Sequence, residues 1–303
     1  MSLTKYRAFL NVASTGSFSE AAQQLHCTQS AASRMIADLE QLWDVRLFSR
    51  FKSGAELTPE GEVLLPLVRD VILADESLKA RLSSLTGLTT GTVRIATYAS
   101  VATAWLPRVI GEFKRMYPHV NYEVLMGDYA EIERLVRTGR VDFGFSTPKI
   151  GEGLDSILVA EDELWLTVSE SHRFAQMSSV PADMLNGESF FLVEMGRASF
   201  VSHYLEREKV NPVIELKTHH DYAILNMVKM NLGVSILPEL VLTQPVEGVV
   251  LKKLEPRAYR EIRLVLRQGM QLSLAAKKFL MCFSTVLKDE VLPTFGKAVR
   301  AFL

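Results

Sequence analysis

Apolar residues in the first 57 positions are spaced for short helices that are separated by tight turns. One helix face is marked by residues that recur every three or four positions: Leu3, Tyr6, Phe9, Leu10 and Ala13. The next segment has the form of a capping box, in which the Ser17 hydroxyl accepts a hydrogen bond from the backbone amide of Glu20. We therefore expect a second helix over residues 18–25 and a third over residues 29–42, with Thr28 as the N-cap of the third.

The third predicted helix carries an apolar face and an opposite polar face. At about 100° per residue, the apolar arc holds Ala31, Ala32, Met35, Ile36, Leu39, Leu42 and Trp43. The polar arc holds Gln29, Ser30, Ser33, Arg34 and Gln41. Side chains of this kind hydrogen-bond to base edges and phosphates, and N-terminal amides favour phosphate. The pattern indicates a helix-turn-helix, although an ordinary three-helix bundle with a solvated polar face matches it too.

Residues 46–57 predict a β-hairpin with its turn at Ser53 and Gly54, which is the layout of a wing. Arg50 and Lys52 lie where such a wing would meet phosphates. Charge totals do not decide the matter, since the whole chain of 303 residues carries 34 basic and 35 acidic side chains. That balance excludes a histone-like polycation, so any nucleic-acid binding must come from a local surface.

Residues 58–86 predict one long helix, with Thr58 as its cap and Pro59 at its first position. A seven-residue repeat with intervening apolar positions marks one seam along this helix: Leu64, Leu67, Val71, Leu78 and Leu85. We expect the same seam of a second copy to cover it, which gives a homodimer. The alternative is a long helix that packs on its own chain.

After a turn-rich hinge at residues 87–91, short apolar strands alternate with amphipathic helices, which predicts α/β architecture. A first β-α-β-α-β series predicts a parallel sheet with strands at residues 93–96, 120–124 and 141–145. A second series begins near residue 161, and its expected strands lie at residues 164–168, 189–193, 214–216 and 234–238. A strand at 262–266 and a helix at 273–287 complete the pattern.

Missing motifs exclude several functional classes. No apolar run reaches the roughly 18 residues of a membrane span, and the N-terminus lacks a signal-peptide pattern, so we expect a cytoplasmic protein. The two cysteines, Cys27 and Cys282, are too far apart for a disulfide framework or a CxxC-type zinc site, and Cys282 lies on a predicted apolar helix. The nucleotide-binding and hydrolase motifs GxxxxGK[ST], GxGxxG, GxSxG and HExxH are absent, so we expect no enzyme activity, no metal and no cofactor.

Several N-terminal motifs occur in one ordered series: FSEAAQQL at 18–25, TQSAASR at 28–34, LE at 39–40, LF at 47–48 and LTPEG at 57–61. The series resembles the N-terminal region of LysR-type transcriptional regulators, and the chain length and the α/β remainder match that family too. The resemblance implies a winged helix-turn-helix whose recognition helix lies in the major groove. The DNA-binding residues that it implies, counted with two capping residues, are Ser17, Thr28, Gln29, Ser30, Ser33, Arg34, Arg50 and Lys52.

The resemblance also implies a sensory domain with two α/β lobes, similar to a periplasmic binding protein. The implied fold class is thus α/β with an N-terminal all-α winged helix-turn-helix. We expect a DNA-binding domain at residues 1–57, a linker helix and hinge at 58–90, and an effector-binding domain at 91–303. Within the last, lobe I comprises residues 91–161 and 266–303, and lobe II comprises residues 162–265.

An effector is expected between the lobes, because ligands of open α/β sheets bind at the carboxyl ends of strands. On this rule and by family position, the expected contacts are Ser100, Val101, Ser146, Thr147, Arg197 and His220. Helix capping is the alternative role for Ser100 and Thr147. An exposed surface position is the alternative for Arg197 and His220.

The function that the resemblance implies is effector-controlled transcriptional regulation. Two recognition helices in a two-fold dimer would lie about 34–36 Å apart, which predicts a pseudo-palindromic operator in double-stranded DNA. The resemblance further implies a homotetramer of two dimers and RNA polymerase as a partner. The alternative is an enzyme or solute-binding protein of the same two-lobed fold with a non-functional helical N-terminus.

Overall fold

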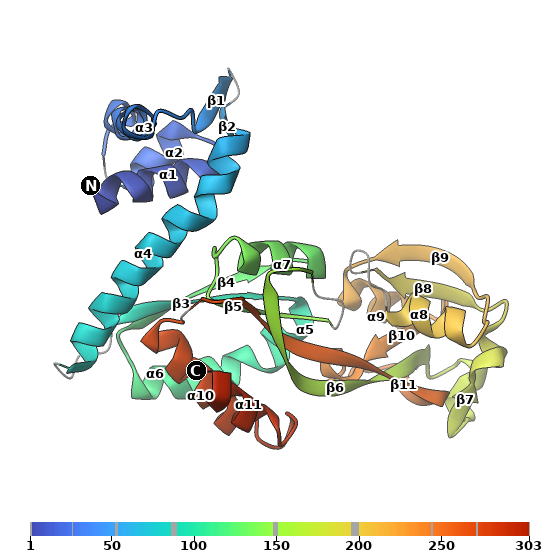
Figure 1. Cartoon of the computed structure of the whole chain (residues 1–303). Coiled ribbons are helices and arrows are strands. Elements are labelled where there is room, and N and C mark those ends of the chain that lie inside the picture. Colours follow the sequence, from blue (N-terminus) through green and yellow to red (C-terminus); the bar gives the residue numbers. More distant parts are fainter. Residues whose placement is uncertain are drawn as a thin grey trace.

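The computed structural model describes residues 2–25, 27–51, 54–85, 90–147, 151–194, 200–243, 245–270 and 272–302. For residues 50, 76, 77, 79–85 and 302 it describes the backbone only. The chain forms a small N-terminal helical domain, one long helix and an elongated two-lobed α/β body (Figure 1), which is the predicted fold class. No helix in the described part of the chain combines the length and the apolar character that crossing a membrane requires.

The N-terminal domain consists of three helices and a two-stranded wing. The helices are α1 (Leu3–Thr15), α2 (Phe18–Gln24) and α3 (Gln29–Trp43), and the antiparallel strands are β1 (Phe48–Phe51) and β2 (Gly54–Leu57). Both predicted caps are confirmed. The Ser17 hydroxyl accepts a hydrogen bond from the Glu20 amide at 3.3 Å, and the Thr28 hydroxyl accepts one from the Ala31 amide at 3.2 Å.

Glycine permits the close approach of α1 and the wing. Gly16 ends α1 with φ 65°, and its carbonyl oxygen accepts a hydrogen bond from the Ala55 amide at 2.7 Å. A Cβ atom at position 54 would lie only 2.6 Å from that same carbonyl oxygen. Any side chain at Gly54 would therefore displace the wing from α1.

The N-terminal domain shares its core with the long helix α4 (Pro59–Leu85). Buried side chains of this core include Phe9, Ile36, Leu39, Phe48, Val68 and Ile72. Leu42, which the periodicity places on the apolar arc of α3, is instead 58% exposed, because it lies in the last turn of the helix beyond the core. The predicted cap of α4 is confirmed, since the Thr58 hydroxyl accepts a hydrogen bond from the Gly61 amide at 3.0 Å.

The first lobe contains the predicted parallel sheet. Its strands are β3 (Gly91–Thr97), β4 (Val120–Met126) and β5 (Phe143–Ser146), with β3 in the middle. The helices of this lobe are α5 (Ala99–Ala104), α6 (Leu106–Met116), α7 (Tyr129–Arg137), α10 (Leu274–Val286) and α11 (Phe295–Phe302). Cys282 belongs to the core of this lobe, as expected, and burial raises the pKa of its thiol to about 11, so the reactive thiolate is disfavoured.

The second lobe has a smaller sheet that is covered on both faces. Its elements are β7 (Ser179–Pro181), β8 (Ser189–Val193), α8 (Phe200–Arg207), β9 (Val213–Thr218), α9 (Asp221–Lys229) and β10 (Ser235–Pro238), with short 3-10 helices at Arg173–Gln176, Ala182–Leu185 and Glu239–Val241. Neighbouring residues of β8, Phe190 and Phe191, belong to two different apolar clusters. Successive side chains of a strand point to opposite faces, so each face of β8 has a core of its own.

Two long antiparallel strands, β6 (Leu154–Ser169) and β11 (Val249–Arg267), join the lobes. Strand β6 pairs with β10 in the second lobe and β11 pairs with β5 in the first, so one mixed sheet runs through the body (Figure 1). The expected strands at 164–168 and 262–266 are therefore parts of much longer strands. The expected lobe boundary between residues 265 and 266 needs correction, because Ile262, Leu264 and Val265 pack in the core of the first lobe.

Candidate nucleic-acid interface and inter-lobe cleft

The N-terminal turns of α3 present a polar surface. The side chains of Gln29, Ser30 and Arg34 are exposed and that of Ser33 is half-buried, while the opposite face of the helix is buried at Ala32, Ile36 and Leu39. The Thr28 hydroxyl, besides capping the helix, lies 3.0 Å from the hydroxyl of Ser30. The structure thus brings five predicted residues onto one accessible edge of a helix whose opposite face packs in the core.

Charge on this surface remains available for an outside partner. Asp38, one turn after Arg34, forms an ion pair with Lys5 of α1 at 2.8 Å. The hydrogen bond from Lys5 lowers the pKa of the Asp38 carboxyl, and the charge of Arg34 adds to the effect. Since Lys5 engages this carboxylate, the exposed Arg34 guanidinium is presented to solvent together with the positive end of the α3 dipole.

The wing lies beside this surface on the same domain (Figure 1). Arg50 lies in β1 opposite Ala55, and only its backbone is described, while Lys52 lies outside the described residues. Phe51, the last residue of β1, is 57% exposed.

The predicted seam on α4 has both exposed and half-buried members. Leu67, Val71 and Leu78 are exposed, with Leu78 at 60%, whereas Leu64 packs against the core of the N-terminal domain. The side chain of Leu85 lies outside the described residues. Three apolar side chains spaced along one exposed face of a 27-residue helix form a surface that a second helix can cover.

A buried arginine that was not predicted from the sequence lies where the lobes meet. Arg260 of β11 is 6% exposed. It donates hydrogen bonds from Nε to the Asp162 carboxylate of β6 at 2.8 Å and from Nη2 to the Ser100 hydroxyl at 2.7 Å. The rings of Tyr98 and Phe200 lie 5.1 and 5.3 Å from its guanidinium carbon. One side chain therefore links the first lobe, the crossing strands and the second lobe.

At this junction the surroundings favour the charged form of Arg260 and disfavour the charged forms of Asp221 and Tyr98. Burial alone would lower the pKa of Arg260, but Asp162 raises it above the ordinary value, so the guanidinium stays protonated. Burial raises the pKa of the Asp221 carboxyl at the start of α9, although Arg260 and His220 oppose the shift. Burial also raises the pKa of the Tyr98 hydroxyl, which is buried without a hydrogen-bond partner in the described part of the chain.

A cleft of about 650 Å³ opens beside this junction, and residues of both lobes line it. Its lining residues are Ala99, Met126, Gly127, Asp128, Glu194, Lys217, Thr218, His219 and His220. A small cavity of about 30 Å³ is lined by Tyr98, Ser100, Asp221 and Arg260, among others. Clefts of roughly 300–1,000 Å³ with a few polar groups are typical of small-molecule sites.

The expected effector contacts lie in different environments. His220 lines the cleft, and Ser100 lines the small cavity and binds Arg260. Ser146 is fully buried and its hydroxyl donates to the Glu133 carboxylate at 3.3 Å, and Thr147 and Val101 are buried too. Val101, Ser146 and Thr147 are not among the described residues that line the cleft or the small cavity. Arg197 lies outside the described residues.

Two family models match the chain. The model described as "LysR substrate binding domain" matches residues 86–288, and the model described as "Bacterial regulatory helix-turn-helix protein, lysR family" matches residues 3–62. The chain belongs to the LysR family. It is therefore a LysR-type transcriptional regulator with an effector-binding domain, and the alternative of an enzyme or solute-binding protein is set aside.

Relatives in this family match along most of their length. The chain is 28% identical to an uncharacterized HTH-type transcriptional regulator, YvbU, of Bacillus subtilis, over 92% of the chain and 97% of the relative. It is 32% identical to the probable HTH-type transcriptional regulator LrrA of Synechococcus elongatus, over 79% of the chain and 82% of the relative.

Solved LysR-family structures share the fold. A full-length OxyR variant of Pseudomonas aeruginosa superposes with a TM-score of 0.75 at 18% identity, covering 96% of this chain and 98% of that one. Full-length CbnR, described as complexed with its target DNA, gives 0.63 at 21% identity, covering 96% and 100%. The regulatory domain of Synechocystis CcmR, described as in complex with 2-PG, gives 0.61 at 21% identity, covering 66% and 99%.

Proposed function

We propose that this LysR-family regulator binds a pseudo-palindromic duplex with two copies of α3 and responds to a small molecule between its lobes. The observation that carries the proposal is the exposed polar face at the N-terminal end of α3. The residues assigned to DNA contact are Ser17, Thr28, Gln29, Ser30, Ser33, Arg34, Arg50 and Lys52. CbnR, a structural neighbour, is described as complexed with its target DNA, which supports DNA binding as the role of this fold.

The side chains on this face have different roles in the proposal. Gln29 and Arg34 carry the donors and acceptors that discriminate base edges, since Gln pairs with adenine and Arg with guanine in the major groove. Ser30 and Ser33 have short hydroxyls that reach a base or a phosphate at close range. Ser17 and Thr28 are the N-caps of α2 and α3, and backbone amides at a helix N-terminus favour phosphate. Arg50 and Lys52 are assigned to contacts with the DNA phosphate backbone beside the wing.

An unbiased selection of duplex oligonucleotides with the purified chain tests the proposal. We expect enriched duplexes with two inverted half-sites about 10 base pairs apart, or a multiple of that spacing, because two-fold related helices meet the groove one helical turn apart. The selection is run with and without a metabolite library. A failure to enrich any duplex under both conditions would contradict the proposed function.

The effector is proposed to lie in the inter-lobe cleft. His220, Lys217 and Thr218 of the second lobe face Ala99 and Asp128 of the first across this space. Ser100 and Arg260 line the small cavity, where Arg260 links the lobes. A ligand that binds one arrangement of the lobes more tightly than another shifts the population towards it, and this changes the geometry of the paired DNA-binding domains. CcmR is described with a bound small molecule, which supports an effector role for this domain.

A homodimer is proposed to form through the exposed side of α4, with a homotetramer of two dimers and contact with RNA polymerase as further steps. Leu78→Lys is expected to give monomers in light scattering, because a charge at this position would have to be buried between two helices. Met230→Lys is the control, since Met230 is also an exposed apolar residue but lies at the end of α9. An unchanged dimer mass for Leu78→Lys would exclude the seam on α4 as the dimer interface.

A further inference from the structure

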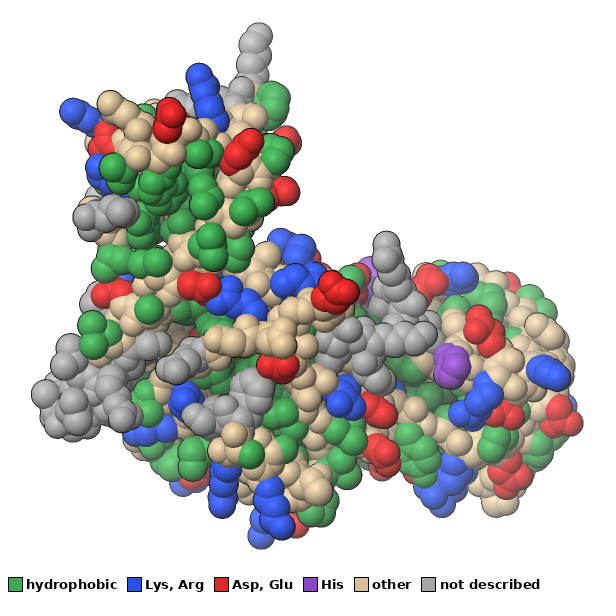
Figure 2. All heavy atoms as spheres, in the orientation of Figure 1, with side chains coloured by type: hydrophobic (Ala, Val, Ile, Leu, Met, Phe, Trp, Pro, Cys, Tyr) green, Lys and Arg blue, Asp and Glu red, His purple; other side chains and the backbone are tan. Residues whose placement is uncertain are grey.

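A second cavity, separate from the inter-lobe cleft, lies where the N-terminal domain and α4 meet the first lobe. Its volume is about 430 Å³, and its described lining residues include none of those that line the inter-lobe cleft. Figure 2 shows Lys and Arg side chains gathered where α4 meets the body of the molecule. Four of the lining residues are arginines: Arg7, Arg69, Arg94 and Arg140. They come from the N-terminal domain, from α4 and from the first lobe.

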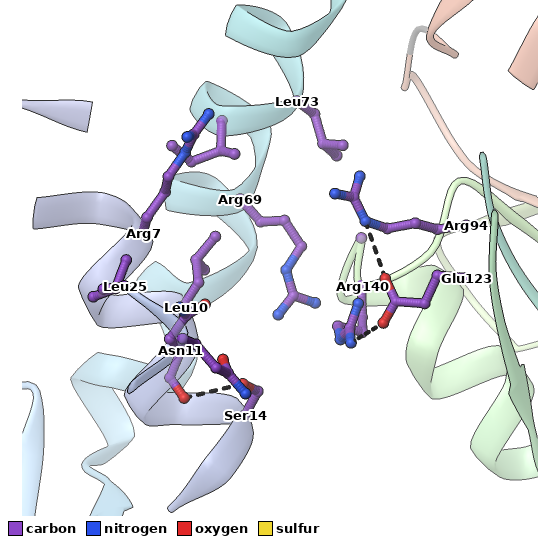
Figure 3. Close-up of a pocket in the computed structure, with 13 residues that line it drawn as sticks. Arg7, Leu10, Asn11, Ser14, Leu25, Arg69, Leu73, Arg94, Glu123 and Arg140 are labelled. Carbon is purple, nitrogen blue, oxygen red and sulfur yellow. Dashed lines mark hydrogen bonds and ion pairs between the residues drawn. The ribbon is translucent and has the colours of Figure 1, made fainter. Parts of the chain in front are cut away.

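The close-up in Figure 3 shows how these arginines lie. Arg7 comes from α1, Arg69 from α4, Arg94 from β3 and Arg140 from the turn before β5. The guanidinium of Arg69 points into the space between α1 and the first lobe, towards that of Arg140. Arginines of the DNA-binding domain, of α4 and of the sensory domain thus line one partly open cavity, with the guanidinium of Arg7 pointing away from those of Arg69 and Arg140 in this view.

Arg69 carries a buried charge that is not neutralised by a carboxylate. It is 8% exposed, and its Nη1 donates to the carbonyl oxygen and the hydroxyl of Thr138 at 3.0 and 3.4 Å, which are neutral groups. Within the described part of the chain, no carboxylate lies at ion-pair distance from Arg69. Gly139, with φ 66°, leaves room for the stem of Arg69, because a Cβ atom there would lie 3.3 Å from its Cδ.

Among the described residues that line the cavity, four are arginines and one, Glu123, is acidic. The Glu123 carboxylate is shared between two guanidiniums, since it pairs with Arg140 and lies 3.3 Å from Nε of Arg94. Arg7 pairs with Asp75 at 3.6 Å. Burial and then the repulsion of Arg140 and Arg94 lower the pKa of Arg69 to about 10, which still leaves it protonated at neutral pH. A bound anion would relieve both the burial penalty and the repulsion.

We propose that this cavity binds a small polyanion, either a phosphate ester or a polycarboxylate, and that the anion bridges the DNA-binding domain and the first lobe. Guanidinium groups hold carboxylate and phosphate oxygens in bidentate geometry, and the space suits a small metabolite. Arg69 and Arg140 contact the anion from α4 and the first lobe, and Arg7 contacts it from α1. The bound anion fixes the orientation of the recognition helix relative to the sensory domain.

Binding is tested by calorimetric titration of the full-length chain, without DNA, with pyrophosphate in one arm and citrate in the other. Ionic strength is held constant, because exposed charges respond to salt alone. We expect saturable binding of at least one probe, and the tighter one identifies the anion class. Arg69→Gln and Arg140→Gln should each raise the Kd at least about tenfold. Arg7→Gln, at an exposed position, provides a third test in which folding is not at risk.

Arg115→Gln is the matched control, because Arg115 is a highly exposed arginine of the same lobe that lies outside the cavity. It should leave the Kd unchanged, as should His220→Ala in the inter-lobe cleft. Absence of saturable binding by both probes would overturn the proposal. Unchanged binding in the Arg69, Arg140 and Arg7 variants would also overturn it, and so would loss of binding in His220→Ala. Competition from a duplex of random sequence would assign the cavity to nucleic-acid backbone instead.

The regulatory consequence rests on the proposed DNA-binding function, whereas the binding itself does not. With the duplex obtained by selection, saturating pyrophosphate or citrate should change the Kd for DNA at least about threefold in the parent chain. In Arg69→Gln the same anion should leave that Kd unchanged. Anion binding without any selected duplex would contradict the proposed function alone. An equal effect of the anion in both chains would contradict the bridging role.

Discussion

An Asp162→Asn variant should lose about 3–5 kcal/mol of its free energy of unfolding, because it leaves the buried Arg260 charge without its carboxylate. The two groups lie 2.7 Å apart at closest approach, and both are almost fully buried. The Asn carbonyl oxygen can still accept the hydrogen bond that Asp162 accepts from the Leu240 amide at 3.0 Å. With its oxygen facing Leu240, the Asn side chain places an NH2 group where Arg260 needs an acceptor, so the substitution removes the charge and this hydrogen bond and keeps the side-chain volume. Urea denaturation followed by circular dichroism measures the loss.

Glu131→Gln is the matched control for this experiment. Glu131 pairs with Arg134 on the surface of α7, where both side chains are exposed. Exposed pairs contribute at most about 1 kcal/mol, since water screens them. If Asp162→Asn were no less stable than Glu131→Gln, the rings of Tyr98 and Phe200 would suffice to hold Arg260. The ion pair would then not be what joins the lobes.

Elements set by nearby residues could be predicted from the sequence. The N-caps Ser17, Thr28 and Thr58 each accept a hydrogen bond from an amide three residues later, so a short window of sequence contains all that the contact needs. The apolar face of α3 is similar, because helical periodicity alone places Ala32, Ile36 and Leu39 together. The bounds that the sequence predicts for α3, the wing and α4 accordingly agree with the observed ones to within one or two residues.

The junction between the lobes could not be predicted in the same way. Arg260 is 98 residues from Asp162 and 160 from Ser100 in the chain, so no local pattern connects them. The sequence pattern also predicts strands at this junction that are too short, for a related reason. Strands β6 and β11 include charged residues such as Glu161 and Glu261, which interrupt the apolar alternation that marks a strand. Glu161 and Glu261 even lie opposite each other in the register, and the strands continue past them through the backbone pairing of β6 with β11.

The strand-end rule, applied to two serines, concerns side chains that lie in different places in the structure. Ser100 follows β3, and its hydroxyl reaches the small cavity between the lobes. Ser146 ends β5, but β11 pairs alongside it, with Arg263 opposite Ser146 in the register. The Ser146 hydroxyl is then used within the lobe, by Glu133. A rule for open sheet edges does not apply where a crossing strand returns to cover the edge.

An Arg34→Ala variant should bind the selected duplex about 5–150-fold more weakly than the parent chain, which corresponds to the 1–3 kcal/mol of one good base contact. Arg34 is exposed on the recognition face and is not part of the core of its domain. The fold should therefore be unaffected, and an unchanged melting temperature checks this point. Fluorescence anisotropy with the selected duplex and with a scrambled duplex measures specific and non-specific binding separately.

Two controls and a salt titration separate base recognition from simple charge in this experiment. Gln41→Ala changes the same polar arc at the far end of α3, and Arg115→Ala removes an equal charge from the sensory domain. Neither should weaken specific binding. If Arg34 binds a base edge, its removal reduces the preference for the selected duplex. If it binds a phosphate instead, its removal weakens both duplexes alike and reduces the salt slope by about one. Equal weakening of both duplexes would mean that Arg34 contacts a DNA phosphate. Gln29 would then have to provide the discrimination between base pairs.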